Sequence, residues 1–293
     1  MTKTAPERFH ARFQRVLDHI DRNLDGDLGL EALSRVAAFS KHHFHRQFTA
    51  LFGVPVHRYV QLVRMKRASY RLAFRREDSI TEIAMDAGYD APEAFGRAFR
   101  QRIGQAPTDF RKTPDWVPWR TALGPLTGAR TMQNQNSFDP DDVAIVDFPA
   151  TAVALMEHRG DPAALGDTIR RFIDWRKRTG IRAASSATYT VFHTDPDTVP
   201  AADYHIDLCA ATARPVAGGA GVTEGLIPAG RCAVLRVTGS SDDLRPAATF
   251  LYRDWLPESG EEVRDFPLYA QRVRFFPDVP EHEAVTDLFL PLQ

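Results

Sequence analysis

The pattern of a short helix, a tight turn and a longer helix occurs twice in the first part of the chain, and this repeat constrains the fold most. Fifty residues separate Leu33, Ala37, Phe39 and Ser40 from Ile83, Ala87, Tyr89 and Asp90; fifty-one separate Phe44, Arg46, Phe48 and Gly53 from Phe95, Arg97, Phe99 and Gly104. A short helix, a turn of three or four residues and a longer helix form the helix-turn-helix pattern. We therefore predict two such units, joined by a basic helix over residues 56–74.

Helix start and stop signals set the boundaries of these units. Ser40 is a favourable N-cap, and Ser79 with Glu82 has the spacing of a capping box. Asp90 is expected to cap the last long helix, with Pro92 in its first turn. The helices are predicted at residues 7–24, 30–37, 40–52, 56–74, 80–87 and 91–103.

The helix that follows Ser40 has an apolar face and a donor-rich face. Phe44 and Phe48 lie on the apolar face, and nothing nearby in the sequence pairs with the donors on the other face, which are Lys41, His42, His45 and Arg46. An ordinary solvated helix has the same pattern, but the repeat favours insertion into a DNA major groove. Arg46 can pair with guanine and the histidines with base edges, whereas Lys41 is expected to hold a phosphate.

The second long helix presents a poorer surface for reading bases. Its outward positions are predicted to be Pro92, Glu93, Gly96 and Arg97, and neither Pro92 nor Gly96 has a side-chain donor. Arg97 corresponds to Arg46 in the repeat. A base contact, a phosphate contact and an anchor to a neighbouring helix remain alternatives for Arg97.

Charge divides the chain into two parts. Residues 1–115 hold 20 Lys and Arg against 14 Asp and Glu, whereas residues 116–293 hold 17 against 24, which indicates different partners for the two parts. Cys209 and Cys232 form no CxxC motif, so a disulfide scaffold is not expected. The N-terminus lacks an apolar targeting segment and no run is long enough to span a membrane, so we expect a cytoplasmic protein without a membrane partner.

Residues 1–112 are assigned to the DNA-binding domain and residues 113–142 to a linker, because prolines at 114, 118, 125 and 140 disfavour a helix. From residue 143 to 293 the order strand, helix, strand, strand occurs twice. The segment Phe172–Trp175 is similar to Tyr252–Trp255, and Ile206–Leu208 is similar to Thr286–Leu288. We predict an α+β domain of two similar β-α-β-β halves, with a cleft between them.

The repeat residues resemble a known family. The run Phe39-Ser40-Lys41 through Phe48, with Ile83-Ala84, Ala87-Gly88-Tyr89 and Pro107 to Arg111, resembles the DNA-binding domain of AraC/XylS-type regulators. This resemblance implies seven helices and binding of promoter DNA. Sequence preference does not carry over, because His42, Pro92 and Gly96 depart from the residues that are usual at these positions.

The second part resembles the GyrI-like small-molecule-binding domain. The similarity rests on the duplicated halves, His158-Arg-Gly160, Trp255 to Gly260, and the ending Thr286 to Pro291. The resemblance implies a cleft that binds hydrophobic, often cationic, compounds through aromatic residues and an acidic residue, which is commonly glutamate and here is Asp287. The expected ligand-binding residues are Trp175, Asp207, Tyr252, Trp255, Tyr269 and Asp287. Aromatic faces with a carboxylate suit a cation, although both tryptophans also fit a hydrophobic core.

We therefore expect a DNA-binding transcriptional regulator, an activator, that senses a small effector and has RNA polymerase as a further candidate partner. Catalytic motifs are absent, and the histidines 158, 193, 205 and 282 show no close pairing in sequence, so no enzyme, metal or cofactor is expected. Two alternatives remain open. In the first, the second domain is a hydrolase that uses Tyr252 and Asp287, since some GyrI-like proteins resemble hydrolases. In the second, this domain is a protein-docking module.

Overall fold

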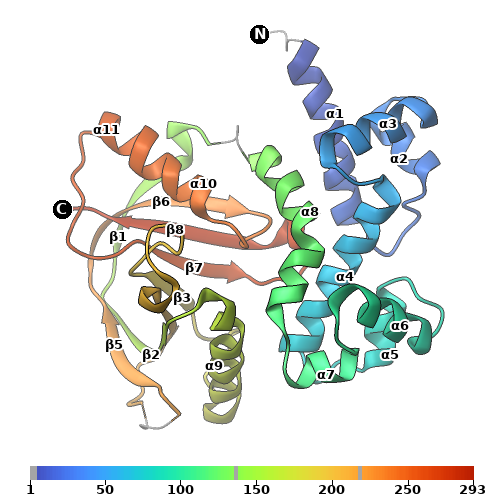
Figure 1. Cartoon of the computed structure of the whole chain (residues 1–293). Coiled ribbons are helices and arrows are strands. Elements are labelled where there is room, and N and C mark those ends of the chain that lie inside the picture. The colour runs from blue at the N-terminus through green and yellow to red at the C-terminus, as the bar shows by residue number, and fades with distance from the viewer. Residues whose placement is uncertain (1–4, 135–137, 217–219) are drawn as a thin grey trace. The chain divides into compact units, whose positions relative to one another are not determined.

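The computed structural model describes residues 5–134, 138–216 and 220–293 (Figure 1). The chain forms two compact units, Met1–Asn136 and Ser137–Gln293. The first is helical and the second is built on one antiparallel sheet, which confirms the predicted fold class. Among the described residues, no helix combines the length and apolar character needed to cross a membrane.

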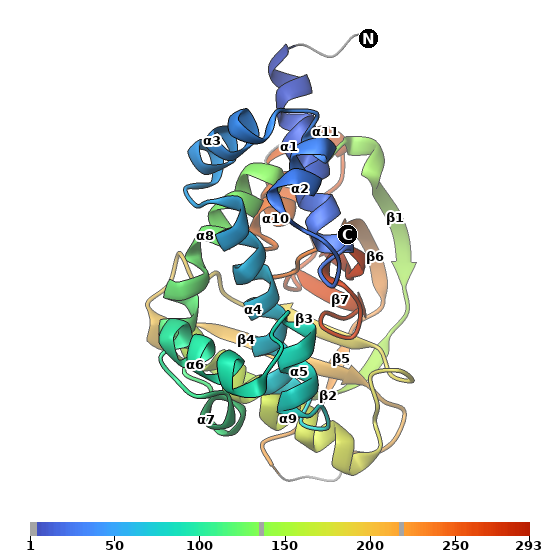
Figure 2. The same ribbon diagram turned by 90° about the vertical axis from the view of Figure 1, so that its right-hand side faces the viewer.

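The first unit contains the seven helices that the AraC-type resemblance implies, followed by an eighth. Their bounds are α1 (Ala5–Arg22), α2 (Leu30–Ala37), α3 (Lys41–Phe52), α4 (Val56–Phe74), α5 (Ile80–Asp86), α6 (Pro92–Ile103), α7 (Pro107–Lys112) and α8 (Trp116–Asn134). The helix pairs α2–α3 and α5–α6 are the two predicted helix-turn-helix units. They lie at opposite ends of α4 (Figure 2).

Each helix-turn-helix unit has its own hydrophobic core. The first half of α4, from Val56 to Val63, packs with α1, α2 and α3, and its second half, from Met65 to Ala73, packs with α5, α6 and α7. The repeated phenylalanines of α3 and α6 are fully buried at equivalent places in these cores: Phe44, Phe48, Phe95 and Phe99. The duplication is therefore a duplication of cores, and α4 is the rigid connection that both cores share.

The local signals at helix ends are reproduced with one exception. The side chain of Ser40 accepts a hydrogen bond from the backbone of His43, and Ser79 with Glu82 forms the complete capping box. Asp90 was predicted to cap α6, but the N-cap is Ala91, which makes no side-chain capping bond. The helix begins one residue later than its counterpart because Pro92, with φ fixed and no N–H, occupies the first helical position.

The prediction that prolines keep residues 113–142 free of helix is wrong for residues 116–134, which form α8. Pro118 lies in the first turn, where the N–H needs no helical partner. Pro125 lies inside the helix, a position that costs about 3 kcal/mol in isolation. Packing offsets this cost, because Leu123 and Leu126 are buried in the first core and Trp119 contacts both cores. Residues 135–137 of the expected linker lie outside the described residues.

The second unit is an eight-stranded antiparallel sheet in the order β1-β6-β8-β7-β3-β4-β2-β5. The strands are β1 (Val143–Phe148), β2 (Thr151–Arg159), β3 (Thr188–Phe192), β4 (His205–Ala211), β5 (Thr223–Ile227), β6 (Gly230–Thr238), β7 (Tyr269–Arg274) and β8 (Val285–Pro291). The helices are α9 (Leu165–Thr179), α10 (Arg245–Thr249) and α11 (Leu256–Ser259), with a π-helical segment over Phe250–Trp255 between the last two. The helix expected in the second half was predicted from the sequence at residues 242–256 but begins at Arg245, and β5 was not predicted.

The two halves of this sheet are similar in detail. The strand order β5-β2-β4-β3 in one half corresponds to β1-β6-β8-β7 in the other. β2 and β6 have the same alternation of buried and exposed positions. Thr190 pairs with Ala270, eighty residues later, so the two halves meet at equivalent positions of β3 and β7.

The two faces of the sheet have different cores. Alternate residues such as Leu208 and Leu288 pack with α9 in one half and with the helical segment 245–259 in the other. The opposite set, which includes Tyr189, Tyr269 and Phe289, forms a separate cluster whose described members include no helical residue. We call this second surface the helix-free face.

Candidate DNA-binding surface and ligand-binding face

Helix α3 is fixed by its aromatic face, which leaves its polar face exposed. Phe44 and Phe48 have no exposed surface, and the ring of Phe44 stacks against that of Phe13 in α1 at 6.1 Å. The helix ends at Gly53, whose φ of 69° is a left-handed conformation that glycine adopts without steric cost. α3 is therefore held at both ends and along one side.

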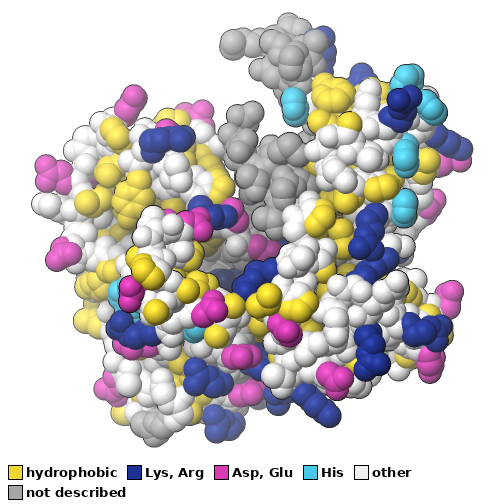
Figure 3. All heavy atoms as spheres, viewed as in Figure 1, with side chains coloured by type: hydrophobic (Ala, Val, Ile, Leu, Met, Phe, Trp, Pro, Cys, Tyr) yellow, Lys and Arg dark blue, Asp and Glu magenta, His cyan; other side chains and the backbone are white. Residues whose placement is uncertain are grey.

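Histidine and basic side chains gather on the surface at α3 (Figure 3). His42, His43 and Arg46 are exposed, whereas His45 is half-buried. His43 was not among the predicted contacts, and its place next to His42 extends the donor surface. This collection of donors is the chemistry that base edges and phosphates require.

Lys41 differs from the sequence-based expectation that it has no partner. Its Nζ lies 2.6 Å from Oε2 of Glu31 in α2, and the ammonium lowers the pKa of that carboxyl through a hydrogen bond. Both side chains are more than half exposed, and exposed pairs are worth little. Lys41 can therefore exchange Glu31 for a phosphate at small cost.

Helix α6 presents fewer donors than α3. Glu93 and Arg97 are exposed, and Pro92 and Gly96 are half-buried. No atom outside the local backbone lies within 4 Å of the position that a Cβ of Gly96 would occupy. This face of α6 therefore has space next to Gly96 and carries no bulky side chain at that position. The equivalent surfaces of the two repeats therefore differ, while their buried faces agree.

Three of the arginines of α4 are engaged inside the helical unit. Nε of Arg64 donates to the carbonyl of Leu24 at 2.9 Å, and Arg67 pairs with Asp25. Arg71 pairs with two carboxylates on α5 and the turn before it, those of Asp86 and Asp78. These guanidinium groups attach α4 to its neighbours, so part of the basic charge of this unit is neutralised locally.

The six predicted ligand-binding residues lie on two different sides of the sheet. Trp175 and Trp255 are buried in the two helix-side cores, and Tyr252 is 47% exposed on the helical segment 250–255. Tyr269, Asp207 and Asp287 belong to the other set of alternating positions and lie on the helix-free face. The predicted residues therefore do not form one group.

Aromatic rings form the floor of the helix-free face. Tyr189 and Tyr269 occupy equivalent positions in the two central strands, with ring centroids 6.3 Å apart, and Tyr269 stacks on Phe289 at 4.8 Å. Phe148, from the edge strand β1, contacts all three rings, and its centroid lies 6.0 Å from that of Tyr189. In a flat sheet, β1 and β3 would be about 19 Å apart, so the sheet is strongly curled over this floor.

Two buried polar groups of this cluster satisfy each other. The hydroxyl of Tyr269 lies 3.4 Å from Sγ of Cys232, and burial raises the pKa values of both groups. Both side chains therefore stay neutral at physiological pH and act as packing groups. Tyr189 and Cys232 were not predicted as part of this surface.

Asp287 is paired with a cationic side chain of the adjacent strand. Nε and Nη2 of Arg236 donate to its two carboxylate oxygens at 2.7 and 2.8 Å. The pair follows from the β6–β8 register, which places Arg236 directly opposite Asp287. Arg236 was not predicted, and because its bond is bidentate, any cation that approached this carboxylate would have to compete with it.

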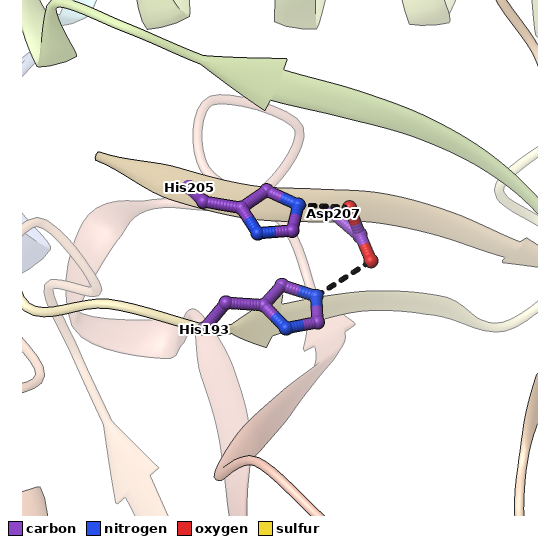
Figure 4. A group of neighbouring side chains, drawn as sticks. All are labelled: His193, His205 and Asp207. Atoms are coloured by element: carbon purple, nitrogen blue, oxygen red, sulfur yellow. Dashed lines mark hydrogen bonds and ion pairs between the residues drawn. The ribbon is translucent and has the colours of Figure 1, made fainter. Parts of the chain in front are cut away.

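Asp207, the equivalent of Asp287, has different partners (Figure 4). Nε2 of His193 lies 2.7 Å from Oδ2 and Nε2 of His205 lies 3.2 Å from Oδ1. The two imidazole rings are stacked, with centroids 3.9 Å apart and planes 6° apart. Burial lowers the pKa of His205, His193 adds to this effect, and Asp207 opposes it.

This group corrects the expectation that the histidines show no close pairing. His205 and Asp207 are two residues apart on β4, so they share a face. His193 directly follows β3, whose antiparallel pairing places Val191 opposite Asp207 and brings His193 to His205. A strand register set by residues far apart in sequence creates the pairing, so inspection of local motifs misses it.

The carboxylates of Asp207 and Asp287 are at opposite sides of the aromatic floor, the group of rings that includes Tyr189 and Tyr269. Asp207 is on β4 and Asp287 on β8, with β3 and β7 between them. Three inter-strand spacings correspond to roughly 14 Å measured along the curled sheet. Tyr189 and Tyr269 lie on the two strands in between, so the helix-free face combines an aromatic floor with an acidic group at each side.

Comparison with known proteins gives matches in both units. Residues 141–293 match the family model of a GyrI-like small molecule binding domain, and residues 33–113 match that of a helix-turn-helix domain. The chain is 35% identical over 153 residues to the probable transcriptional regulator YgiV of Escherichia coli (strain K12), an alignment that covers 52% of this chain and 96% of YgiV.

Two further similarities are more distant. The chain is 28% identical over 142 residues to the right origin-binding protein of Escherichia coli (strain K12), covering 48% of this chain and 49% of that protein. Among solved structures, EcmrR in its DNA complex aligns with a TM-score of 0.45 at 12% identity, covering 86% of this chain and 82% of that one.

Proposed function

The chain belongs to the family of proteins with a GyrI-like small molecule binding domain, carried here behind an AraC-type helix-turn-helix domain, and from this premise we propose how it acts as a transcriptional regulator. The helical unit binds double-stranded promoter DNA. The second unit binds a small effector, and the effector changes the affinity for DNA. We propose that this unit binds without turnover.

We propose that α3 reads bases and that α6 positions the protein on DNA. His42, His45 and Arg46 supply donors on the exposed side of α3, and the Ser40 cap orders the first turn. Lys41 exchanges Glu31 for a backbone phosphate. On α6, Pro92, Glu93 and Gly96 approach the DNA without reading bases, and Arg97 contacts phosphate. Asp90, in the turn before α6, also approaches the DNA without reading bases.

We place the effector on the helix-free face. The observation that carries this proposal is the aromatic floor of Tyr189 and Tyr269 between Asp207 and Asp287. Tyr189 and Tyr269 are buried in the structure, so a ligand reaches them only after a local rearrangement. A flat apolar molecule with a positive charge then matches their chemistry, because it stacks on the rings and approaches a carboxylate. Trp175, Trp255 and Tyr252, on the other side of the sheet, support the fold of the domain or lie at its surface.

Binding of a cation requires a local rearrangement. Arg236 already neutralises Asp287, but its side chain is 63% exposed, so it can turn into water at a modest cost. Phe148 covers part of the floor from an edge strand that is held by one neighbour, β6. The site therefore accepts a ligand when Arg236 leaves Asp287 and when Phe148 moves away from Tyr189 and Tyr269, so that these rings become accessible.

The proposal is tested by thermodynamic coupling in the full chain. A fluorescent aromatic cation of the rhodamine class is titrated with and without a DNA fragment that the protein has selected from a random pool. If the effector regulates DNA binding, its dissociation constant changes on adding DNA, and the DNA affinity changes by the same factor on adding the cation. Tyr269→Ala is expected to abolish the change, and circular dichroism checks that this variant folds, because the ring is fully buried. Tyr252→Ala is the control on the other side of the sheet. Binding of both partners without mutual effect would exclude the cation as an effector.

A further inference from the structure

The group His193, His205 and Asp207 contains three side chains of the kinds that bind transition metals. Their candidate ligand atoms lie within 4.8 Å of one another. Two imidazole nitrogens and a carboxylate oxygen are the donor set of many zinc sites and of sites with two histidines and one carboxylate. We propose that this group binds a divalent transition-metal ion of the Zn²⁺ type.

The geometry of the group supports a common metal position. Both Nε2 atoms point to the same carboxylate, at 2.7 and 3.2 Å (Figure 4). Ligand atoms about 2.0–2.1 Å from a tetrahedral Zn²⁺ are separated by roughly 3.3 Å, close to these distances. The two rings are parallel, with centroids 3.9 Å apart, so they must tilt toward each other for their in-plane lone pairs to meet at one ion. In the metal-free form each Nε2–H donates to the carboxylate; when an ion binds at Nε2, each imidazole stays neutral and carries its proton on Nδ1 instead.

The strand framework holds the three ligands in place. His205 and Asp207 share one face of β4, and both are largely buried, with 13% of each side chain exposed. His193 comes from the end of β3 and is 30% exposed, which leaves the group accessible from solvent. The ion would therefore keep at least one position for water, or for a donor atom of a bound molecule.

A nearby carboxylate adds to the preference for a cation. Glu157 on β2 lies directly opposite Asp207 on β4, and like charges in this position are destabilising unless a cation compensates them. The carboxylate of Glu157 now lies 3.2 Å from Arg159, which is itself opposite His205. A divalent ion between the histidines and Asp207 would relieve the repulsion between the two acidic groups.

The other half of the sheet provides an internal comparison. The residues eighty positions after His193 and His205 are Val273 and Val285. The carboxylate of Asp287 is paired with Arg236. This half lacks imidazole ligands at the equivalent positions. We therefore expect one ion per chain and not two.

The test uses the full chain without a polyhistidine tag, first stripped with a chelator and then titrated with Zn²⁺ or Co²⁺ alone. Calorimetry gives stoichiometry and affinity, and the visible spectrum of Co²⁺ reports imidazole coordination. We expect one ion per chain, and affinity reduced more than about 100-fold in His193→Gln and in Asp207→Asn, because loss of a direct ligand exceeds the effect of outer-shell changes. Asp287→Asn, at the equivalent position of the other half, should bind the ion as the wild type does.

Further variants separate this site from the exposed histidines of α3. The double variant His42→Ala/His45→Ala should retain the ion, and circular dichroism establishes that each variant is folded. His193 is the most exposed member of the group, so its substitution is the least disruptive. An ion retained in His193→Gln and lost in the α3 variant would overturn the assignment, as would a wild-type chain that binds no ion. Because no DNA or organic ligand is added, the outcome is independent of the proposed effector.

Discussion

The helical unit and the sheet unit each contain a duplication, and the two duplications differ in what they preserve. In the helical unit the repeated residues are mostly buried, as with Phe48 and Phe99, while the exposed positions of α3 and α6 have diverged. In the sheet unit an acidic residue is present in both halves, but its partners differ: two histidines contact Asp207 and one arginine contacts Asp287. Duplication thus supplies the scaffold, and the surroundings of each polar group determine its chemistry.

The largest expected effect concerns the buried part of the helical repeat. Phe48→Ala and Phe99→Ala should each destabilise the helical unit by about 3–5 kcal/mol, because both rings are fully buried. Chemical denaturation gives the size of the effect, and hydrogen exchange shows its location. The first variant should loosen α3 more than α6, and the second should do the reverse, since the rings belong to separate cores. Equal loosening of both helices in both variants would show that the two cores act as one.

The exposed part of the repeat should give a smaller and asymmetric effect. Arg46→Ala is expected to weaken specific DNA binding by roughly 1–3 kcal/mol and to relax discrimination at one base pair. Arg97→Ala should weaken binding to all sequences alike and reduce the salt dependence, as loss of a phosphate contact does. Binding assays with selected and random fragments at two salt concentrations distinguish the variants. If Arg46→Ala lowers affinity for every sequence equally, α3 has no privileged role in base reading.

The different partners of the two carboxylates can be compared through ligand affinity. Arg236→Gln removes the charge that competes for Asp287, so an aromatic cation should bind about 1.5 kcal/mol more tightly, which is roughly tenfold. Fluorescence titration of the full chain measures the change. Arg231→Gln is a suitable control, because this arginine is also on β6 but pairs with Glu261. An unchanged affinity in Arg236→Gln would mean that the ligand does not use Asp287.

The smallest expected effect is a change in the pH dependence of stability. The hydrogen bond from Arg67 lowers the pKa of Asp25 below its unfolded value of 3.8. This pair therefore contributes stability above about pH 4 and loses it as the pH falls through the folded pKa. Asp25→Asn should reduce the loss of stability on acidification by well under 1 kcal/mol, because the carboxylate is mostly exposed. If Asp25→Asn lost more stability on acidification than the wild type, the stabilising contribution assigned to ionised Asp25 would be contradicted.

Local signals were sufficient to predict much of the helical unit. The predicted bounds at residues 30–37 and 56–74 agree with α2 and α4, because caps, glycines and prolines act within one helical turn. The same rules failed for α8, where burial of Leu123 and Leu126 outweighs an interior proline. Helix propensity depends on neighbouring residues in the sequence, whereas packing against two cores depends on residues that are distant in the sequence.

The arrangement of the helix-free face, where we propose that the effector binds, was predicted only in part for a related reason. The alternation of strand residues was visible, but the face to which each residue belongs depends on the register between strands. Arg236 and Asp287 are opposite each other although 51 residues separate them, and His193 meets His205 through the β3–β4 pairing. Strand β5 was missed because its residues, Thr223 to Ile227, are mostly exposed and include a glycine.

The most direct measurement of the central claim is selection of bound fragments from a random pool of double-stranded DNA. The full chain and the triple variant His42→Ala/His45→Ala/Arg46→Ala are compared at the same salt concentration. We predict that the wild type enriches a defined sequence, and that the variant still binds DNA but enriches none. Failure of the wild type to enrich any sequence, or enrichment of the same sequence by both proteins, would contradict the assignment of α3 as the base-reading helix of a sequence-specific regulator.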